Sequence, residues 1–469
     1  MRRMSRSRPT PAVFRPGISM AICGLLAFAS PLTATGDPFA TEQKVSGSRA
    51  GDISPCNQSD ISDHALTLTE VVEYALCNNP QTRETWANAK AQAAQIGIAE
   101  SAYLPTLSGS ASASRNRAAS AGQQTINSQS SAGVTLNYLL YDFGSRDAAL
   151  ESAEETLKAL NATQNATLQS VFLAALQAYY QLFAARAATE AADKARTSSQ
   201  ESLNAATTRY RIGAATSADK LQAQTAFAQA ALNLLTAEGN EQIARGVLAN
   251  AMGLEANQPL HISAPVSTPD EHFEADIDKL IDIARKQRPD LIAAESQLKA
   301  ARASLHGSEA ADMPTISLFA NQNISRTSNT NPYHSGAVGL SVSLPLFTGY
   351  NTTYRILAAE AQLEARTAQR DRIHRQISLD VWRACQNLKT NTATVRASAE
   401  LLASAEESER LANGRYKAGV GNMVDLLTAQ SALASARQQR VQALYNWQIA
   451  RATLAQAIGQ QPEIIRKKP

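Results

Sequence analysis

The chain is poor in the residues that build thick hydrophobic cores. Aromatic side chains make up only 5% of its 469 residues, although apolar residues as a whole make up 44%. Alanine supplies much of the apolar share, and with many Gln, Ser and Thr residues it favours closely packed helices over a globular core. Beyond the first 35 residues there is no run of 18 apolar residues, so we expect no membrane-spanning helix. Strands could still enter a membrane.

Signatures of catalysis and of cofactor binding are also missing. The six histidines are scattered without an i, i+4 pair, so we expect no metal site. The sequence has no glycine-rich phosphate loop and no nucleophile paired with a base. Asp142-Phe143-Gly144 matches a kinase triplet, but no other kinase motif accompanies it. We therefore expect neither enzyme activity nor a cofactor.

Residues 1–34 are predicted to be a secretory signal peptide. Five arginines precede an apolar run at 18–29, which is too short to span a membrane, and small residues at 27–29 and 32–34 offer cleavage sites. An amphipathic anchor is the alternative, but the run has no polar face. The net charge of +3 belongs to this segment, because its removal takes away five arginines and no acid. No nucleic-acid partner is therefore implied.

The four cysteines have different expected roles. Cys23 follows Met20-Ala21-Ile22, which is no lipobox, so we expect a mature protein without a lipid. Cys56 and Cys77 could form a disulfide in an oxidising compartment and fix the N-terminal tail, and two free thiols are the alternative. Cys385 lies among small residues and is interpreted as a packing residue.

The most informative pattern is an internal repeat with an offset of about 206 residues. Arg209-Tyr210, Gly213, Asp219 and Gln224 recur as Arg415-Tyr416, Gly419, Asp425 and Gln430. Repeats of solenoid proteins span only about 20–50 residues, so this one indicates a duplicated half-domain. Each copy predicts helices, two short strands, a very long helix, a tight turn and a return helix.

These patterns divide the chain into segments. An extended tail at 35–65 precedes a first repeat at 66–253, a linker at 254–276, a second repeat at 277–459 and a C-terminal tail at 460–469. The first repeat is expected to hold strands at about 105–115 and 132–143, a long helix at 145–211 and a return helix at 217–252. The second is expected to hold strands at about 314–326 and 336–348, a long helix at 350–417 and a return helix at 422–458.

The predicted strands alternate between apolar and small or polar residues. Val134, Leu136 and Tyr138 alternate with Thr135 and Asn137, and Val338, Leu340 and Val342 repeat the pattern. Such segments are typical of membrane barrels, although a soluble hairpin packed on helices is the alternative. Two strands per repeat make four per chain, which is too few to close a barrel.

Each long helix would extend about 100 Å, because about 67 residues rise 1.5 Å each. A helix of about 23 residues and a return helix of about 36, stacked end to end, would nearly match that length. Small residues recur at spacings of three and four in the long helices, which predicts close helix approach, with a two-stranded coiled coil as the alternative. The remaining Gln, Asn, Thr and Ser faces are suited to lining water.

Taken together, the motifs resemble the TolC family of bacterial outer-membrane export tunnels over residues 66 to 459. The resemblance is carried by Leu66-Thr67-Leu68, Ala75 to Pro80, Tyr103-Leu104-Pro105, Tyr141 to Gly144, Arg209-Tyr210, Pro345-Leu346-Phe347, Arg415 to Gly419 and Asp425-Leu426-Leu427. It implies a mixed α/β membrane protein, a homotrimer that shares one 12-stranded barrel in outer-membrane lipid. A periplasmic α-helical barrel would continue from it. Inward-curled coiled coils would close its entrance until a periplasmic adaptor and an inner-membrane pump open it.

The turns of the two repeats are the candidate functional site. Asp219 and Asp425 each follow a turn glycine, Gly213 or Gly419, by six residues. At a helix N-terminus each acid would stabilise the helix start by about 0.3–1 kcal/mol, or the acids would ring a pore mouth. We expect the turn glycines, with Arg209 and Arg415, to contact the adaptor.

The resemblance makes Asp425 an entrance acid and Tyr416 a retained gate residue. Thr428 stands where a second acid is common, and Gly421 stands where a basic residue often holds the entrance shut. The closing network is therefore thinned, and we expect a weak closed state.

The absence of a lipobox favours the toxin-exporting type I branch over the lipidated multidrug branch. The N-terminus with its cysteine and residues Ala75 to Asn79 look similar to exporters of large RTX toxins such as adenylate cyclase–haemolysin. The implied partners are then an inner-membrane ABC transporter and an exported protein cargo. An outlet for drugs or metals is the alternative. A secreted coiled-coil fibre is a third possibility, but it leaves the strand hairpins without a purpose.

Overall fold

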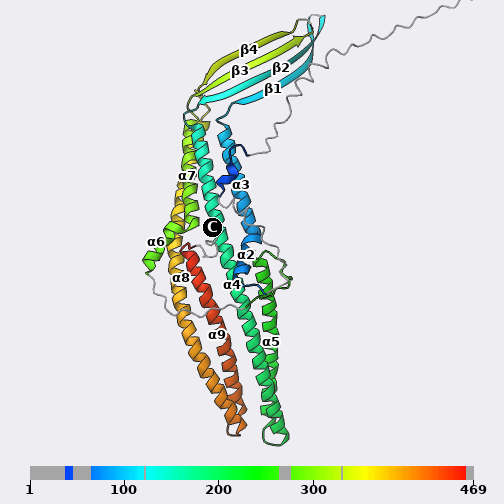
Figure 1. Cartoon of the computed structure of the whole chain (residues 1–469), viewed down its shortest axis with the longest axis vertical. Helices are drawn as coiled ribbons and strands as arrows, with labels where there is room; N and C mark the ends of the chain where they lie inside the picture. Colours follow the sequence, from blue (N-terminus) through cyan, green and yellow to red (C-terminus); the bar gives the residue numbers. More distant parts are fainter. Residues whose placement is uncertain (1–36, 46–64, 121–122, 264–275, 329–330, 461–469) are drawn as a thin grey trace, which may run out of the picture.

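The molecule is elongated, with a β-sheet at one end and long helices running away from it (Figure 1). The computed structural model describes residues 37–45, 65–120, 123–263, 276–328 and 331–460. The predicted signal peptide at 1–34 lies outside these ranges, as does nearly all of the C-terminal tail at 460–469. No helix within the described ranges has the length and apolar character needed to cross a membrane.

The same order of elements occurs twice. A 3-10 helix, η1 (Thr41–Lys44), precedes the first set, which is α2 (Leu68–Asn78), α3 (Pro80–Ser101), β1 (Thr106–Ser120), β2 (Gln123–Tyr141), α4 (Ser145–Arg211) and α5 (Ser217–Ala251). The second set is α6 (Ile277–Gln287), α7 (Pro289–Ala310), β3 (Thr315–Thr327), β4 (Tyr333–Ser343), α8 (Asn351–Lys417) and α9 (Met423–Ala457).

The sheet has the order β1-β2-β3-β4, with antiparallel pairing throughout. The register places apolar residues on one face, namely Leu107, Val134, Leu136, Tyr138, Leu318, Val338, Leu340 and Val342. The opposite face carries Ser108, Thr135, Asn137, Ser317, Asn321 and Ser341. Phe319 is an exception on the polar face, where its ring lies over Gly339. A sheet with one apolar and one polar face suits a boundary between lipid and water.

The predicted strand bounds were wrong in two places. The first strand was expected to end at about 115 and the second to begin at about 132, but β1 and β2 continue pairing from Arg115↔Ser128 to Ser120↔Gln123. Ladder hydrogen bonds join main-chain groups, so a Ser- and Asn-rich segment without proline pairs without any apolar alternation. β4 was expected at 336–348 but ends at Ser343, because Pro345 has no N–H to donate.

The long helices lie close to their expected ranges. α4 spans the expected 145–211, and α8 begins one residue later than expected because Tyr350 is its N-cap in a left-handed conformation, φ 64°. Each contains 67 residues and therefore extends about 100 Å. The return helices α5 and α9 begin after the N-cap residues Thr216 and Asn422.

Shorter helices stack end to end beside the long ones. The Asn79 side-chain amide, at the start of α3, donates to the Ala251 carbonyl oxygen at the end of α5, at 3.4 Å. Gly253 has φ 75°, and a Cβ there would lie 2.6 Å from the Asn78 carbonyl oxygen. A Cβ on its repeat counterpart Gly459, also at φ 75°, would lie 3.0 Å from the main-chain nitrogen of Arg288, the N-cap residue of α7. Each repeat therefore pairs one long helix with a composite one (Figure 1).

The hydrophobic core is divided into several small clusters along the helices. One lies where α2, α4 and α5 meet the strand-like segment of Ile262, which forms a parallel bridge with Leu66. A second joins α6, α7, α8 and α9. The tail at 35–65 is not simply extended, because η1 packs on α3 and Lys44 forms an ion pair with Glu100 at 2.7 Å.

Candidate functional site

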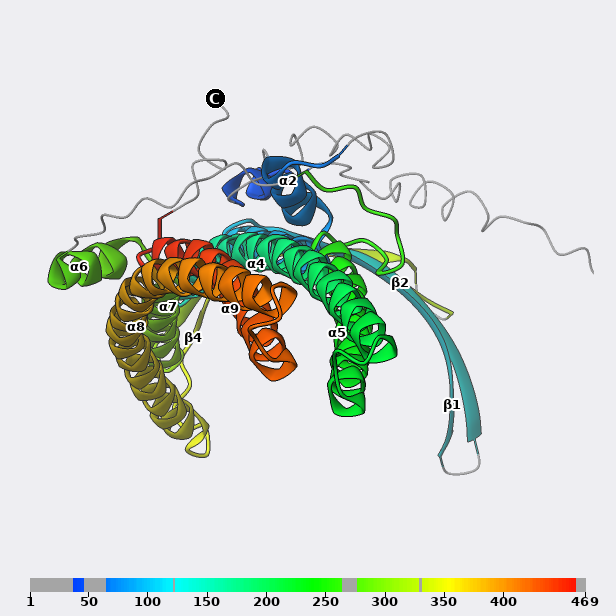
Figure 2. The same cartoon turned by 90° about the horizontal axis from the view of Figure 1, so that it is seen from below.

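The turns of the two helical hairpins lie together at the end of the molecule opposite the sheet (Figure 1). Seen along the long axis, the helices follow an arc, and both hairpin ends lie on its concave side (Figure 2). Gly213, at φ 75°, joins α4 to α5, and Gly419, at φ 80°, joins α8 to α9. Glycine suits both turns because other residues are strained at positive φ.

Arg209 fastens the first hairpin to the second. Its guanidinium carbon lies 4.5 Å from the centre of the Tyr416 ring, and Nη2 donates to the Lys417 carbonyl oxygen at 3.0 Å. Tyr416 is only 5% exposed and packs in a cluster with Ala206 and Leu426. Burial raises the pKa of Tyr416, and the nearby guanidinium opposes that rise. The two predicted residues Arg209 and Tyr416 therefore form one contact between hairpins.

A second contact lies about two turns further up α4. The Gln430 amide nitrogen on α9 donates to Ser198 Oγ at 3.0 Å and to Ser202 Oγ at 3.1 Å. The sequence identifies Gln430 as a member of the repeat but does not predict this role. The available signal was the recurrence of a glutamine in both return helices, together with small residues in both long helices.

The two predicted acids are both N3 residues of their helices, but they are held differently. Asp219 forms a capping box, in which its carboxylate accepts from the Thr216 N–H at 2.9 Å and from Oγ1 at 2.8 Å. The Asp425 N–H donates to the Asn422 side chain at 2.7 Å, and the Asp425 side chain itself is exposed. Asp219 thus acts as a helix cap, whereas Asp425 leaves a carboxylate at the surface.

The remaining predicted residues do not join this contact within one chain. Thr428 and Arg415 are exposed. A Cβ on Gly421 would lie 3.0 Å from the Tyr416 nitrogen, so a larger residue there would have to shift the turn. Among the described residues no group of three metal-ligating side chains occurs.

Only one of the two cysteines of the predicted disulfide lies in the described residues. Cys77 is disulfide-bonded, and Cys56 lies outside the described residues, so the pairing of the two stays a prediction. Cys385 is free and buried, and burial raises the pKa of its thiol.

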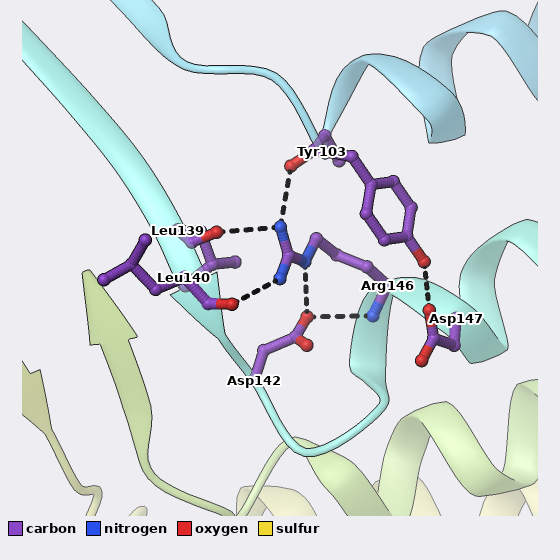
Figure 3. Close-up of polar contacts among 7 residues, drawn as sticks. Tyr103, Leu139, Leu140, Asp142, Arg146 and Asp147 are labelled. Carbon is purple, nitrogen blue, oxygen red and sulfur yellow. Dashed lines mark hydrogen bonds and ion pairs between the residues drawn. The ribbon is translucent and has the colours of Figure 1, made fainter. Parts of the chain in front are cut away.

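A separate polar cluster, also missed by the sequence prediction, fixes the corner between the sheet and α4 (Figure 3). Arg146 donates to the carbonyl oxygens of Leu139 at 2.9 Å and Leu140 at 3.4 Å, and to the Asp142 carboxylate at 3.1 Å. Tyr103 donates to Asp147, and burial together with this acceptor raises the pKa of Tyr103 to about 12. The kinase-like triplet at 142–144 is therefore part of a structural corner.

A polar groove follows the helices between the corner and the turns. It has a volume of about 1090 Å³ and is lined by residues of α4, α5 and α9 and by Glu409 of α8. Its polar lining is mostly uncharged and includes Gln177, Gln181, Gln229, Asn233, Asn240, Gln438, Gln442 and Asn446. Such a wall is suited to contact with water.

Comparison with known proteins identifies the family to which this chain belongs. The model of the "Outer membrane efflux protein" family matches residues 71–254 and 280–460, which are the two repeats. Protein CyaE of Bordetella pertussis is 31% identical over 425 residues, which cover 89% of each chain. Outer membrane protein TolC of Vibrio cholerae is 24% identical and covers 84% of this chain and 91% of its own.

Solved structures of outer-membrane proteins have the same fold as this chain. A membrane protein of Pseudomonas aeruginosa superposes with a TM-score of 0.76 at 25% identity, covering 84% of this chain and 93% of its own. The CmeC outer membrane channel of Campylobacter jejuni gives a TM-score of 0.78 at 20% identity, covering 85% and 88%. The fold is that of the trimeric TolC-like channels, in which each chain adds four strands to a shared barrel above a helical tunnel. Channel proteins rather than enzymes make up this group, and the chain is a member of the outer membrane efflux protein family, located in the outer membrane with a large periplasmic part.

Proposed function

We propose that the protein is the outer-membrane duct of a type I secretion system. Three copies would share one barrel and one helical tunnel, and would passively conduct an exported protein, such as an RTX toxin, to the cell exterior. The duct itself would catalyse no reaction and need no cofactor.

The open sheet is the observation that carries this proposal. Within the described part of the chain, its edge strands β1 and β4 each pair on one side only, and one face is apolar while the other is polar. Unpaired strand edges are not tolerated in lipid, so further copies must complete the sheet. The long helices and the polar groove then continue the passage on the periplasmic side.

The secretion branch is supported by sequence relatives. Protein CyaE is 31% identical over nearly the whole chain, whereas relatives named as efflux proteins, such as BepC of Brucella suis, are 24% identical. TolC-like channels work with an adaptor and an inner-membrane transporter. We infer the same here, with an ABC transporter as the pump and the turns at Gly213 and Gly419 as the adaptor contact.

We further propose that Asp425 contributes to a ring of acids at the entrance and that the closed state is weak. Thr428 supplies no second acid, and Gly421 supplies no basic side chain. Conductance of the wild type and of Thr428→Asp in planar lipid bilayers tests this idea, with Thr225→Asp on the exposed surface of α5 as the control. We expect the wild type to conduct more than the Thr428→Asp variant. A wild-type conductance as low as that of tightly closed relatives would contradict it.

The second candidate is the outlet of a drug or metal efflux pump. It is favoured by the names of several relatives, among them the toluene efflux pump protein TtgC of Pseudomonas putida at 25% identity.

Deletion of the gene separates the two candidates. We expect a large protein to disappear from the culture medium and to return on complementation, while sensitivity to drugs and metals stays the same. Increased sensitivity with unchanged secreted proteins would establish the efflux outlet instead. A neighbouring toxin operon or pump operon in the genome gives an independent check.

A further inference from the structure

The two hairpins of one chain meet through α4 and α9, one long helix and one return helix. Gln430 on α9 binds Ser198 and Ser202 on α4. The internal repeat means that α8 and α5 carry the corresponding surfaces. Within the described residues, however, α8 and α5 do not pack on each other, because they lie at opposite ends of the arc (Figure 2).

The polar residues of this contact are conserved between the repeats. The repeat offset relates Ser198 and Ser202 to Ser404 and Ser408 on α8, and Gln430 to Gln224 on α5. All three counterparts are exposed in the single chain. Tyr210, the counterpart of the buried Tyr416, is likewise 46% exposed.

The apolar part of the contact changes in a complementary way. Leu203 on α4 and Leu426 on α9 pack in the same cluster within the chain. Their counterparts are Glu409 on α8 and Lys220 on α5, which carry opposite charges. The apolar pair is thus replaced by two residues that can form a salt bridge. Such complementary charges are typical of surfaces that face each other in an interface between two copies.

The surface around Gln224 is also hollowed. A groove of about 530 Å³ is lined by Leu203, Thr207, Lys220, Gln224 and Phe227, among others. The counterparts of Lys220 and Gln224 are Leu426 and Gln430, which α4 covers within the chain. The groove on α5 is therefore exposed, whereas the corresponding surface of α9 is covered by α4.

We propose that α8 of a second copy of this chain occupies this groove. Gln224 binds Ser404 and Ser408 of the adjoining copy, and Lys220 pairs with its Glu409. Arg415 of the adjoining copy corresponds to Arg209 and lies over Tyr210 of the first copy. This contact rests on the trimer of the proposed function and names the residues that join its copies near the entrance.

Cross-linking of cysteine pairs tests the geometry in the detergent-purified full chain. In a Cys385→Ala background, Gln224→Cys with Ser404→Cys is treated with a short bis-maleimide, and Ser198→Cys with Gln430→Cys is the matched control. We expect the first pair to give dimers and trimers on a denaturing gel, and the control pair to give only cross-links within one chain. Size exclusion establishes separately whether the uncross-linked protein is a trimer.

Charge reversal tests the predicted salt bridge. Lys220→Glu and Glu409→Lys should each lower the temperature at which the trimer dissociates, and the double variant should restore most of the loss. The same exchange at Glu190 and Lys194, an exposed ion pair within α4 at 2.6 Å, is the control and should have no effect. A stable trimer without the Gln224–Ser404 cross-link and without charge rescue would overturn this inference and leave the proposed function intact. A protein that forms no trimer would overturn both.

Discussion

At the scale of single residues, two arginines each join one element of the structure to another. Arg209 reaches from α4 to the main chain of Lys417, and Arg146 holds the carbonyl oxygens at the end of β2. A guanidinium group suits both places, because its five N–H donors can satisfy several acceptors at once. One arginine therefore helps to fix the end of the sheet, and the other helps to fix the tip of the helices.

Replacing Arg146 should destabilise the protein strongly. The Arg146 and Asp142 side chains are only 13% and 9% exposed, so Arg146→Ala leaves a nearly buried carboxylate without its partner. We expect a loss of about 3–5 kcal/mol in the free energy of unfolding. Arg196→Ala on the same helix is the control, because Arg196 and Asp193 are 45% and 54% exposed and their pair contributes about 1 kcal/mol or less. Thermal unfolding in detergent measures both variants, and equal losses would contradict the assignment.

The two acids at the turns should respond differently to substitution. Asp219→Ala removes a capping box, so we expect α5 to be destabilised by about 1 kcal/mol. Asp425→Ala leaves the Asn422 cap in place and should cost only the helix-dipole contribution of about 0.3–1 kcal/mol. Its main effect should be a lower preference for cations, measured as the reversal potential across a lipid bilayer under a salt gradient. The entrance-ring proposal fails if Asp219→Ala changes selectivity and Asp425→Ala does not.

At the scale of elements, each repeat relies on the stacking of one helix on another. The start of α3 meets the end of α5, and the start of α7 meets the end of α9. Pro80 and Pro289 begin the upper helices at positions where no helical N–H is required. Glycines at 253 and 459 end the lower ones and leave room for the close approach.

Alanine substitution in and after α5 tests this junction. Gly253→Ala forces a residue with a Cβ into φ 75° and brings that Cβ within 2.6 Å of the Asn78 carbonyl oxygen. We expect a loss of at least about 1–2 kcal/mol from the left-handed conformation alone. Gly239→Ala inside the same helix meets nothing within 4 Å and should stabilise it by about 0.5–1 kcal/mol. Circular dichroism during heating compares the two, and a neutral Gly253→Ala would refute the close junction.

At the scale of the whole molecule, one chain has too few strands to enclose a passage. In the residues that the structure describes, the sheet has four strands and two open edges, and the helices follow an arc instead of a closed ring (Figure 2). Both ends of the molecule are therefore incomplete in the same way. Addition of further copies about one axis would close the sheet and the helical wall together.

The mature protein should therefore purify as a trimer that requires detergent. Each sheet presents an apolar face, so withdrawal of detergent should cause aggregation. Light scattering coupled to size exclusion measures the mass of the protein without the detergent contribution. A monomer that stays in solution without surfactant would contradict the proposed trimer.

The sequence alone determined the elements whose signal is local and periodic. The repeat offset, the 67-residue helix at 145–211 and the alternation of Val134, Leu136 and Tyr138 are visible in the chain, because helix and strand periods place side chains on faces. The chemistry of the turns was visible in the same way, since a glycine and an N-terminal acid recur in both copies.

Only the tertiary structure decided where the strands end and which residues join distant segments. The pairing of Arg115 with Ser128 depends on main-chain groups that every residue carries, so composition could not reveal it. The acceptors of Arg146 are carbonyl oxygens, and the partners of Gln430 are two serines on a helix more than 220 residues away. The contact of Gln430 exists only once packing has brought α4 and α9 together, because its partners are far away in the extended chain.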